Sequence, residues 1–163
     1  MMQPNLFAQA KTSFGDDVAS LDGIMKAYYD VVSVKAGGKI SFERDSLLHY
    51  RNVMVGLTTE NKNKQPVIYF VTLKQYHQMV DSSMQAEGFY EKEISRKVEH
   101  FGSIYNVWST YETRRTQDGP VIERGINSVQ LFYDGKRFWI TSWIFDTERD
   151  DNKIPSKYLS SNE

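Results

Sequence analysis

PVIERGINSVQLFYDGKRFWITSWIF, residues 120–145, is the stretch that decides the fold of this chain. Two long runs rich in β-branched and aromatic residues, 120–133 and 136–145, flank the pair Asp134-Gly135. Such side chains favour strands, and an Asp-Gly pair accommodates the positive φ angles of a tight type I′ turn. The stretch therefore predicts a β-hairpin with Asp134 and Gly135 at its turn.

Further strands are predicted upstream of this hairpin. The runs 89–99 and 103–115 precede it and extend it into an antiparallel meander of long strands. Earlier in the chain, 52–60 and 66–73 are also β-rich, and the polar loop 61–65 joins them. Because no βαβ rhythm links these runs, we expect an antiparallel sheet.

Three helices are predicted to cover one face of the sheet. Apolar residues recur at helical spacing from residue 16 onward, and this first helix is expected to end at the glycines 37–38. A shorter second helix spans 41–50. The third lies between Thr72 and Gly88, where Thr72 and Gln75 match a capping box. Helices on one face of an antiparallel sheet make an α+β fold.

The whole chain, residues 1–163, is predicted to be a single domain. Its balance of 40% hydrophobic and 25% charged residues is ordinary for a globular core. Residues 1–14 are unpatterned and are expected to form a flexible arm, and residues 147–163 are expected to form an extended polar tail. The apolar residues of this tail that are available to dock on the body are Ile154, Tyr158 and Leu159.

Charge and composition exclude several classes of function. The 20 basic and 21 acidic side chains give a net charge of -1, so nothing favours nucleic acid or an acidic membrane surface as a partner. No apolar run is long enough to span a bilayer, and the first residues do not resemble a signal peptide. The chain has no cysteine, which excludes disulfides and thiolate chemistry and is compatible with the cytoplasmic location that we predict.

Both faces of the long strands 103–115 and 120–133 carry polar and apolar residues. A sheet with one solvated face should alternate cleanly, so we expect both faces to be covered. The helices and a cavity would cover one face, and a second copy of the chain would cover the outer face of the meander in a homodimer. The residues predicted to bind a ligand in the cavity or to lie in the interface are Trp108, Asn106, Arg124, Asn127, Gln130 and Trp143.

The order of these elements resembles the nuclear transport factor 2-like superfamily. The segments that carry the resemblance are ERDSLLHYRNVMV (43–55), IYNVWSTYETR (104–114), RGINSVQLFYDGKRFWITSWIFDTE (124–148) and IPSKYL (154–159). They look similar to a bacterial group of uncharacterised members related to ketosteroid isomerases and polyketide cyclases. The resemblance implies a cystatin-like cone, in which a curved antiparallel sheet wraps around the long first helix and a cavity opens between them. It also implies a homodimer through the outer face of the meander.

The same resemblance implies a catalytic alternative. Ketosteroid isomerases use a tyrosine on the first helix as oxyanion donor and a carboxylate after the second helix as base. Tyr28 or Tyr29 would take the tyrosine's place. His49 is the candidate base at the mouth of the cone, because histidine titrates near neutral pH. The region 49–52 holds no acid, and the acid expected inside the long strand 103–115 is missing as well, so the chain departs from the isomerase pattern.

The other histidines and the acids of one strand are predicted to face solvent. We place His77 on a polar helix face and His100 in a turn, and their spacing predicts no metal site. Alternation puts Glu91, Glu93 and Glu99 on a solvated strand face. No phosphate loop, nucleophile elbow or dinucleotide fingerprint is found, so no cofactor is predicted.

Three functions stay open at this point. The leading interpretation is a protein that binds a small hydrophobic or aromatic molecule in the cone cavity. The second is a cofactor-free isomerase, dehydratase or cyclase, with Tyr28 or Tyr29 as oxyanion donor and His49 as base. The third is a dimeric interaction module whose cone is filled by its own side chains.

Overall fold

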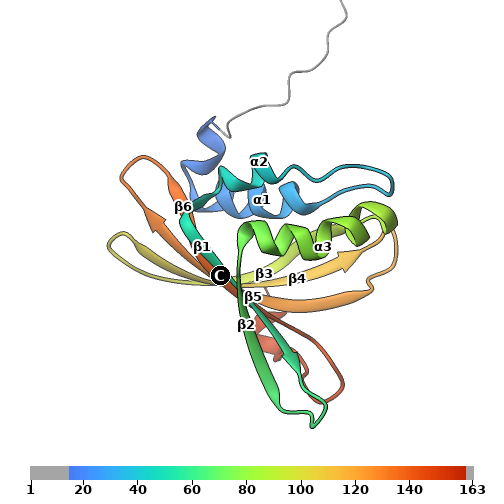
Figure 1. Ribbon diagram of the computed structural model, residues 1–163. Helices are drawn as coiled ribbons and strands as arrows, with labels where there is room; N and C mark the ends of the chain where they lie inside the picture. Colours follow the sequence, from blue (N-terminus) through green and yellow to red (C-terminus); the bar gives the residue numbers. More distant parts are fainter. Residues whose placement is uncertain (1–14, 161–163) are drawn as a thin grey trace, which may run out of the picture.

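The computed structural model describes residues 15–160, and Figure 1 shows how their elements are arranged. The elements, in chain order, are η1 Gly15–Val18, α1 Leu21–Val32, α2 Phe42–Ser46, β1 His49–Glu60, β2 Pro66–Thr72, α3 Leu73–Glu87, β3 Tyr90–Phe101, β4 Ile104–Arg114, β5 Glu123–Tyr133, β6 Phe138–Thr147 and η2 Ser156–Tyr158. The arm predicted over 1–14 and residues 161–163 of the predicted tail lie outside the described residues. No helix within 15–160 is long and apolar enough to cross a membrane.

One curved six-stranded sheet carries the three α-helices of the described chain on a single face (Figure 1). The strand order is β2-β1-β6-β5-β4-β3, and β3, β4, β5 and β6 are antiparallel neighbours, as the meander predicts. The strands β1 and β2 form the other predicted hairpin, which extends away from the helices. The predicted α+β fold with a curved sheet is confirmed. We call the face that carries the helices the inner face and the opposite one the outer face.

The pairing of β1 with β6 is parallel, which the sequence did not predict. Val55 lies opposite Trp143, and Leu57 lies opposite Phe145. The other four strand pairs are antiparallel, as expected. One edge of β1 pairs with β2, and β6, the last strand of the meander, pairs with the other edge. At that position β6 runs in the same direction as β1, so the pair is parallel.

The hairpin between β5 and β6 forms where it is predicted, but its turn differs. The connection is a four-residue loop, 134–137, because Tyr133 pairs with Phe138. Only Gly135 in this loop has a positive φ, +93°, so the predicted type I′ turn is wrong. Asp134 holds the loop instead: its Oδ1 accepts the backbone N–H groups of Lys136 and Arg137, each at 2.8 Å.

The first two helices are shorter than predicted. Ser20 caps α1, since its Oγ accepts the N–H of Gly23 at 3.0 Å, so the helix begins five residues after the predicted start at residue 16. It ends at Val32, well before the predicted stop at 37–38. The second helix ends at Ser46, and strand pairing has already begun by His49. His49 is therefore the first residue of a strand, where the parallel partner β6 overrides the local helical pattern.

The third helix begins where the sequence predicts. The Oγ of Thr72 accepts the N–H of Gln75 at 3.2 Å, and the Oε1 of Gln75 accepts the N–H of Thr72 at 2.9 Å. This reciprocal capping box fixes the start of α3 directly after β2. Leu73, His77 and Met84 are the buried residues of this helix, so its inner stripe includes a histidine.

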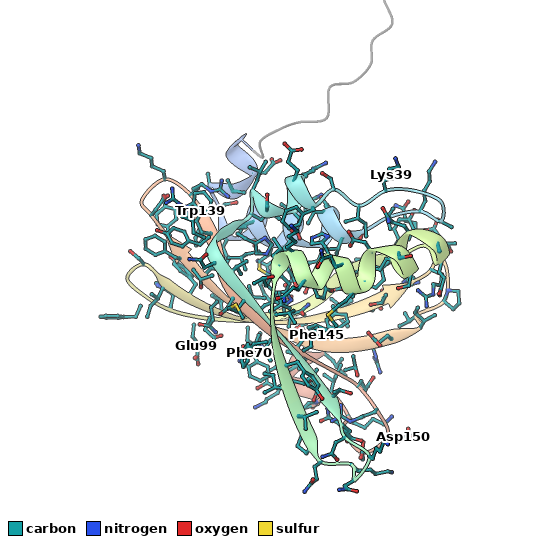
Figure 2. All side chains as sticks on the ribbon, in the orientation of Figure 1. Lys39, Phe70, Glu99, Trp139, Phe145 and Asp150 are labelled. Carbon is teal, nitrogen blue, oxygen red and sulfur yellow. The ribbon has the colours of Figure 1, made fainter. Side chains whose placement is uncertain are left out.

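A β-bulge in β3 changes which side chains face the helices. Glu93 pairs with Tyr111 but Ser95 pairs with Thr110, so Ile94 is an extra residue at the bulge. Glu91 and Glu93, before the bulge, are partly buried and reach partners on the inner face, and the prediction that they are solvated is wrong. Glu99, beyond the bulge, is exposed as predicted (Figure 2).

A hydrophobic cluster fills the space between the helices and the sheet, where Figure 2 shows the side chains crowded together. Its most deeply buried members are Ile24, Met25, Leu48, Val55, Val107, Val129 and Ile140. Since they come from α1, from the connection between α2 and β1, and from four different strands, their burial fixes the helix against the centre of the sheet.

Candidate functional site

The aromatic centre of the inner face brings four of the predicted site residues together. Trp143 of β6 lies with its ring 5.8 Å from that of Tyr28 and 5.0 Å from that of His49. Tyr76 of α3 approaches the same indole at 5.8 Å, and Tyr28 contacts Tyr29 at 5.0 Å. Trp143, Tyr28 and Tyr29 are buried, so this centre is a dry aromatic surface formed by α1, α3 and β6.

His49 is buried beside this aromatic centre with one ring nitrogen unused. Its Nδ1 lies 2.9 Å from the backbone oxygen of Asp45, an acceptor, so Nδ1 carries the hydrogen and donates it. No described residue provides a partner for Nε2, which is buried. Burial lowers the pKa of His49 below its usual value, against the opposing effect of Asp45. The imidazole is therefore neutral near pH 7, with a free lone pair on Nε2.

His77 is buried between two carboxylates, and the prediction that it lies on the surface is wrong. Its Nε2 is 2.9 Å from Oδ2 of Asp45, and its Nδ1 is 2.9 and 3.0 Å from the two oxygens of Asp81. Burial alone would lower the pKa of His77, but the bonds to Asp45 and Asp81 outweigh it and raise the pKa. Both nitrogens can donate at once only in the charged imidazolium. The sequence signal for this cluster is the i, i+4 spacing of His77 and Asp81 on one helix.

His100 is exposed, as predicted, although it lies in β3 rather than in a turn. Its ring stacks on that of Tyr105 at 4.9 Å. Within the described part of the chain, no three His, Cys, Asp or Glu residues are arranged to hold a metal ion.

A second polar network lies on the same inner face and is centred on Asn127 of β5. Its Nδ2 donates to the hydroxyl of Tyr29 and to Oε1 of Glu91, each at 3.2 Å. The Tyr29 hydroxyl lies 2.6 Å from Oγ of Ser109. Ser109 in turn donates to Glu93 at 2.5 Å. Two of the predicted site residues, Tyr29 and Asn127, are therefore joined in one network.

The two acids of this network differ in their partners. Glu93 accepts from both Nε and Nη2 of Arg96, at 2.9 and 2.5 Å, and Arg96 also pairs with Asp22 at 2.7 Å. No lysine or arginine of residues 15–160 forms an ion pair with Glu91. Burial raises the pKa of Glu91 to about 8, the Asn127 bond opposes this, and nearby Glu123 adds to it. Glu91 is therefore mostly protonated at neutral pH.

Tyr111 and Glu123 lie close enough to this network to interact electrostatically with Glu91. Burial raises the pKa of Glu123, and its hydrogen bond with Tyr111 opposes the rise. Gly125 makes room for the tyrosine, because a Cβ at this position would lie 2.4 Å from the Tyr111 hydroxyl oxygen. The sequence did not identify Glu91, Glu123 or Tyr111, since strand alternation without the bulge assigns Glu91 to the solvated face.

The remaining predicted ligand-binding residues lie on the outer face. Trp108 stacks on Tyr158 of the tail with ring centroids 5.5 Å apart. Gln130 donates to Asn106 at 2.7 Å, and both lie near solvent. Arg124 pairs with Glu148 at 2.8 Å. The structure therefore divides the predicted set, because only Asn127 and Trp143 reach the inner face. The inward acid comes from β3 and not from the long strand that holds Asn106 and Trp108.

The C-terminal tail docks on the outer face and forms one wall of a pocket there. The backbone oxygen of Tyr158 accepts from Thr110 at 2.6 Å, and that of Ser160 accepts from Ser95 at 2.9 Å. The pocket has a volume of about 350 Å³. Its apolar lining residues are Trp108, Ile126, Ile144, Phe145, Ile154 and Pro155. Tyr158 docks as the sequence suggests, Ile154 is partly buried, and Leu159 is exposed.

Comparisons with known proteins show relatives of the fold. No family model and no curated protein matches the chain. A structure described as an NTF-2-like protein of unknown function from Silicibacter pomeroyi aligns with a TM-score of 0.55 and 11% identity, covering 80% of this chain and 94% of that one. A Nostoc punctiforme protein of unknown function with a cystatin-like fold aligns at 0.56 and 8%, covering 78% and 87%. The β subunit of a putative aromatic-ring-hydroxylating dioxygenase from Novosphingobium aromaticivorans aligns at 0.56 and 13%, covering 79% and 88%.

Proposed function

We propose that this chain, which has the nuclear transport factor 2-like fold that its sequence resembles, binds a small hydrophobic or aromatic molecule on the inner face of its sheet. The observation that carries the proposal is Glu91, an inward-facing carboxyl group without a basic partner among the described residues. If Glu91 served only stability, an ion pair with a basic side chain would make its burial less costly, as the ion pair with Arg96 does for Glu93. A perturbed acid beside aromatic side chains is typical of a functional site.

The chemistry around Glu91 indicates the kind of ligand. A protonated carboxyl group donates one hydrogen bond and accepts another, and the Asn127 amide beside it is already oriented by Tyr29. The buried rings of Tyr28, Tyr76 and Trp143 pack against one another nearby and make the surroundings of this carboxyl group apolar. We therefore favour an uncharged molecule with an aromatic or alicyclic ring and one carbonyl or hydroxyl oxygen.

A fluorescence titration tests this proposal. In a Trp108→Phe, Trp139→Phe background, Trp143 is the remaining tryptophan, since the chain has three. Addition of 2-naphthol or acetophenone is expected to change its emission saturably at pH 6.5, and benzoate should bind more weakly because its carboxylate would be buried without a basic partner. Glu91→Ala is expected to weaken binding at least tenfold, while Glu99→Gln, an exposed position on the same strand, leaves it unchanged. A signal that survives Glu91→Ala would contradict the proposed anchor.

The second candidate is cofactor-free acid–base catalysis as an isomerase, dehydratase or cyclase. The observation that favours it is the buried Nε2 of His49, which no described residue occupies. In this proposal His49 takes a proton from the substrate, and Tyr28 or Tyr29 donates to the oxyanion. His49→Ala is expected to abolish turnover of a substrate that the titration identifies, whereas His100→Ala keeps it. Equal turnover in the two variants would exclude His49 as the base.

We also propose that two copies pair through the outer face. Ile68, Phe70 and Trp108 are 42%, 57% and 39% exposed. The side chains of Ile68 and Ile144 meet above Gly56, where a Cβ would lie 3.1 and 2.7 Å from them, so their apolar surface is continuous. Light scattering after size exclusion should give twice the chain mass. Ile68→Lys should give a monomer, and Tyr69→Lys on the opposite face of β2 should not; a monomeric wild type would sink this proposal.

If the chain dimerises but no compound changes the Trp143 emission, the third candidate, an interaction module without ligand, is favoured over the first. The bacterial origin and the cytoplasmic location stay predictions, and fractionation of the source cells would check the location.

A further inference from the structure

A chain of four side chains runs from a surface groove to the aromatic centre. The groove lies along α3 and has a volume of about 560 Å³; Asp81 and His77 are among its lining residues. From Asp81 the chain passes through His77 to Asp45 by contacts of 2.9 Å each. Oδ1 of Asp45 then lies 3.6 Å from Nδ1 of His49. Exposure falls along this path, since the Asp81 side chain is 24% exposed and the others 5% or less.

We propose that Asp81, His77 and Asp45 are positioning residues that hold His49 neutral, protonated on Nδ1, with its Nε2 lone pair available inside the fold. The inference rests on the second proposed function only where the Nε2 lone pair is given a use, as the base that takes a proton from a substrate. The arrangement itself follows from the contacts.

The orientation of His49 follows from its position above α2. The backbone oxygen of Asp45 takes the Nδ1 hydrogen at 2.9 Å, so the hydrogen cannot reside on Nε2 in a neutral ring. The two ring nitrogens of imidazole point in nearly opposite directions, so Nε2 points away from α2. The ring lies against Trp143, 5.0 Å between centroids and tilted by 37°, which restricts its rotation.

The charge of His49 depends on which groups the Asp45 carboxylate contacts. A carboxylate next to a histidine ordinarily favours the imidazolium. Here Asp45 is shared, and the imidazolium of His77 occupies Oδ2 at 2.9 Å. Positive charge on His77 therefore opposes a second positive charge on His49, in addition to the effect of burial. Asp81, the more exposed of the two carboxylates, contacts Nδ1 of His77 and stabilises the protonated form of that histidine.

Within residues 15–160, the charged groups that act on the pKa of His49 are Asp45 and His77. Tyr28 of α1 packs against the same Trp143 ring as His49, and burial raises the pKa of that tyrosine far above its usual range, so it stays neutral. From α3 come His77 and Tyr76, whose pKa is also raised by burial. From β6 comes Trp143, which does not titrate. The electrostatic control of His49 thus passes through Asp45 and His77.

Nitrogen-15 NMR of the full chain tests the proposal without any ligand. The chain has three histidines, so the ring nitrogens of His49, His77 and His100 can be assigned in one long-range spectrum followed from pH 5 to 9. Wild-type His49 should show the Nδ1–H tautomer near pH 7. In Asp81→Asn, His77 loses its outer carboxylate and becomes neutral at lower pH, so the measured pKa of His49 should rise above its wild-type value.

Two further variants complete the experiment. His77→Gln keeps a donor towards Asp45 but removes the charge, so His49 should again titrate at higher pH. Glu87→Gln is the matched control, because Glu87 is an exposed acid on the same helix that pairs with Arg115. A purely structural role would leave the His49 titration unmoved in folded Asp81→Asn, and that result would overturn the proposal. An Nε2–H tautomer in the wild type would also overturn it. Because no substrate is used, neither result depends on whether the chain is an enzyme.

Discussion

Replacing Glu91 with glutamine is expected to stabilise the protein at neutral and alkaline pH. Burial raises the pKa of Glu91 from 4.5 to about 8. Between these values the folded chain keeps a proton that the unfolded chain has released, so stability falls as pH rises through this window. The amide of glutamine is of similar shape and has no charge to lose. The variant therefore lacks this part of the pH dependence.

The magnitude follows from the width of the window. At 1.36 kcal/mol for each pH unit, the interval from 4.5 to about 8 corresponds to on the order of 5 kcal/mol. Glu91 is partly exposed, so solvent screening reduces this figure. We expect the stability of Glu91→Gln, relative to the wild type, to increase by about 2–5 kcal/mol between pH 4.5 and pH 8.5.

Urea denaturation of both proteins, followed by tryptophan fluorescence at several pH values, measures this difference. His49 and His77 also titrate differently in the folded chain, but both are present in each protein, so the comparison isolates Glu91. Glu99→Gln, at an exposed position on the same strand, should follow the wild type at every pH. A constant offset between wild type and Glu91→Gln from pH 4.5 to 8.5 would refute the reasoning.

Three other predictions concern the packing. Gly125→Ala should cost about 1–3 kcal/mol in urea, because its Cβ would lie 2.4 Å from the Tyr111 hydroxyl, and Tyr111→Phe in the same chain should recover part of this loss. Tyr158→Ala should expose Trp108 and shift its emission to longer wavelength; unchanged emission would mean that the tail does not dock in solution. If the described elements form a single domain, as we propose, fluorescence and circular dichroism should report one coincident unfolding transition, and two separate midpoints would contradict it.

Local patterns predicted much of the fold. The alternating runs around Asp134-Gly135 identify two strands and their connection, and the pair Thr72 and Gln75 identifies the start of α3. Both signals act between residues close in sequence, so the local chemistry is complete in the sequence itself. The prediction of a type I′ turn is wrong because of another short-range interaction. The Asp134 side chain accepts hydrogen bonds from the loop amides and stabilises a four-residue loop instead.

The candidate site could be predicted only in part. Tyr28, Tyr29 and Trp143 were identified by their type and by the resemblance, and they do meet on the inner face. His77 and Glu91 were placed in solvent, because a charged residue without a visible partner is normally exposed. Their partners, Asp45 and Asn127, are distant in sequence, and no pattern links them before the chain folds.

The sequence by itself determined the fold class, the meander and the aromatic character of the interior, because periodicity and turn chemistry are short-range properties. Tertiary structure alone decided which polar groups face inward. One extra residue at Ile94 reverses the faces of β3 and turns Glu91 towards the helices. The parallel pairing of β1 with β6 places His49 at the start of a strand beside Trp143. Both outcomes depend on how distant strands align, and that alignment is settled by the burial of the whole core.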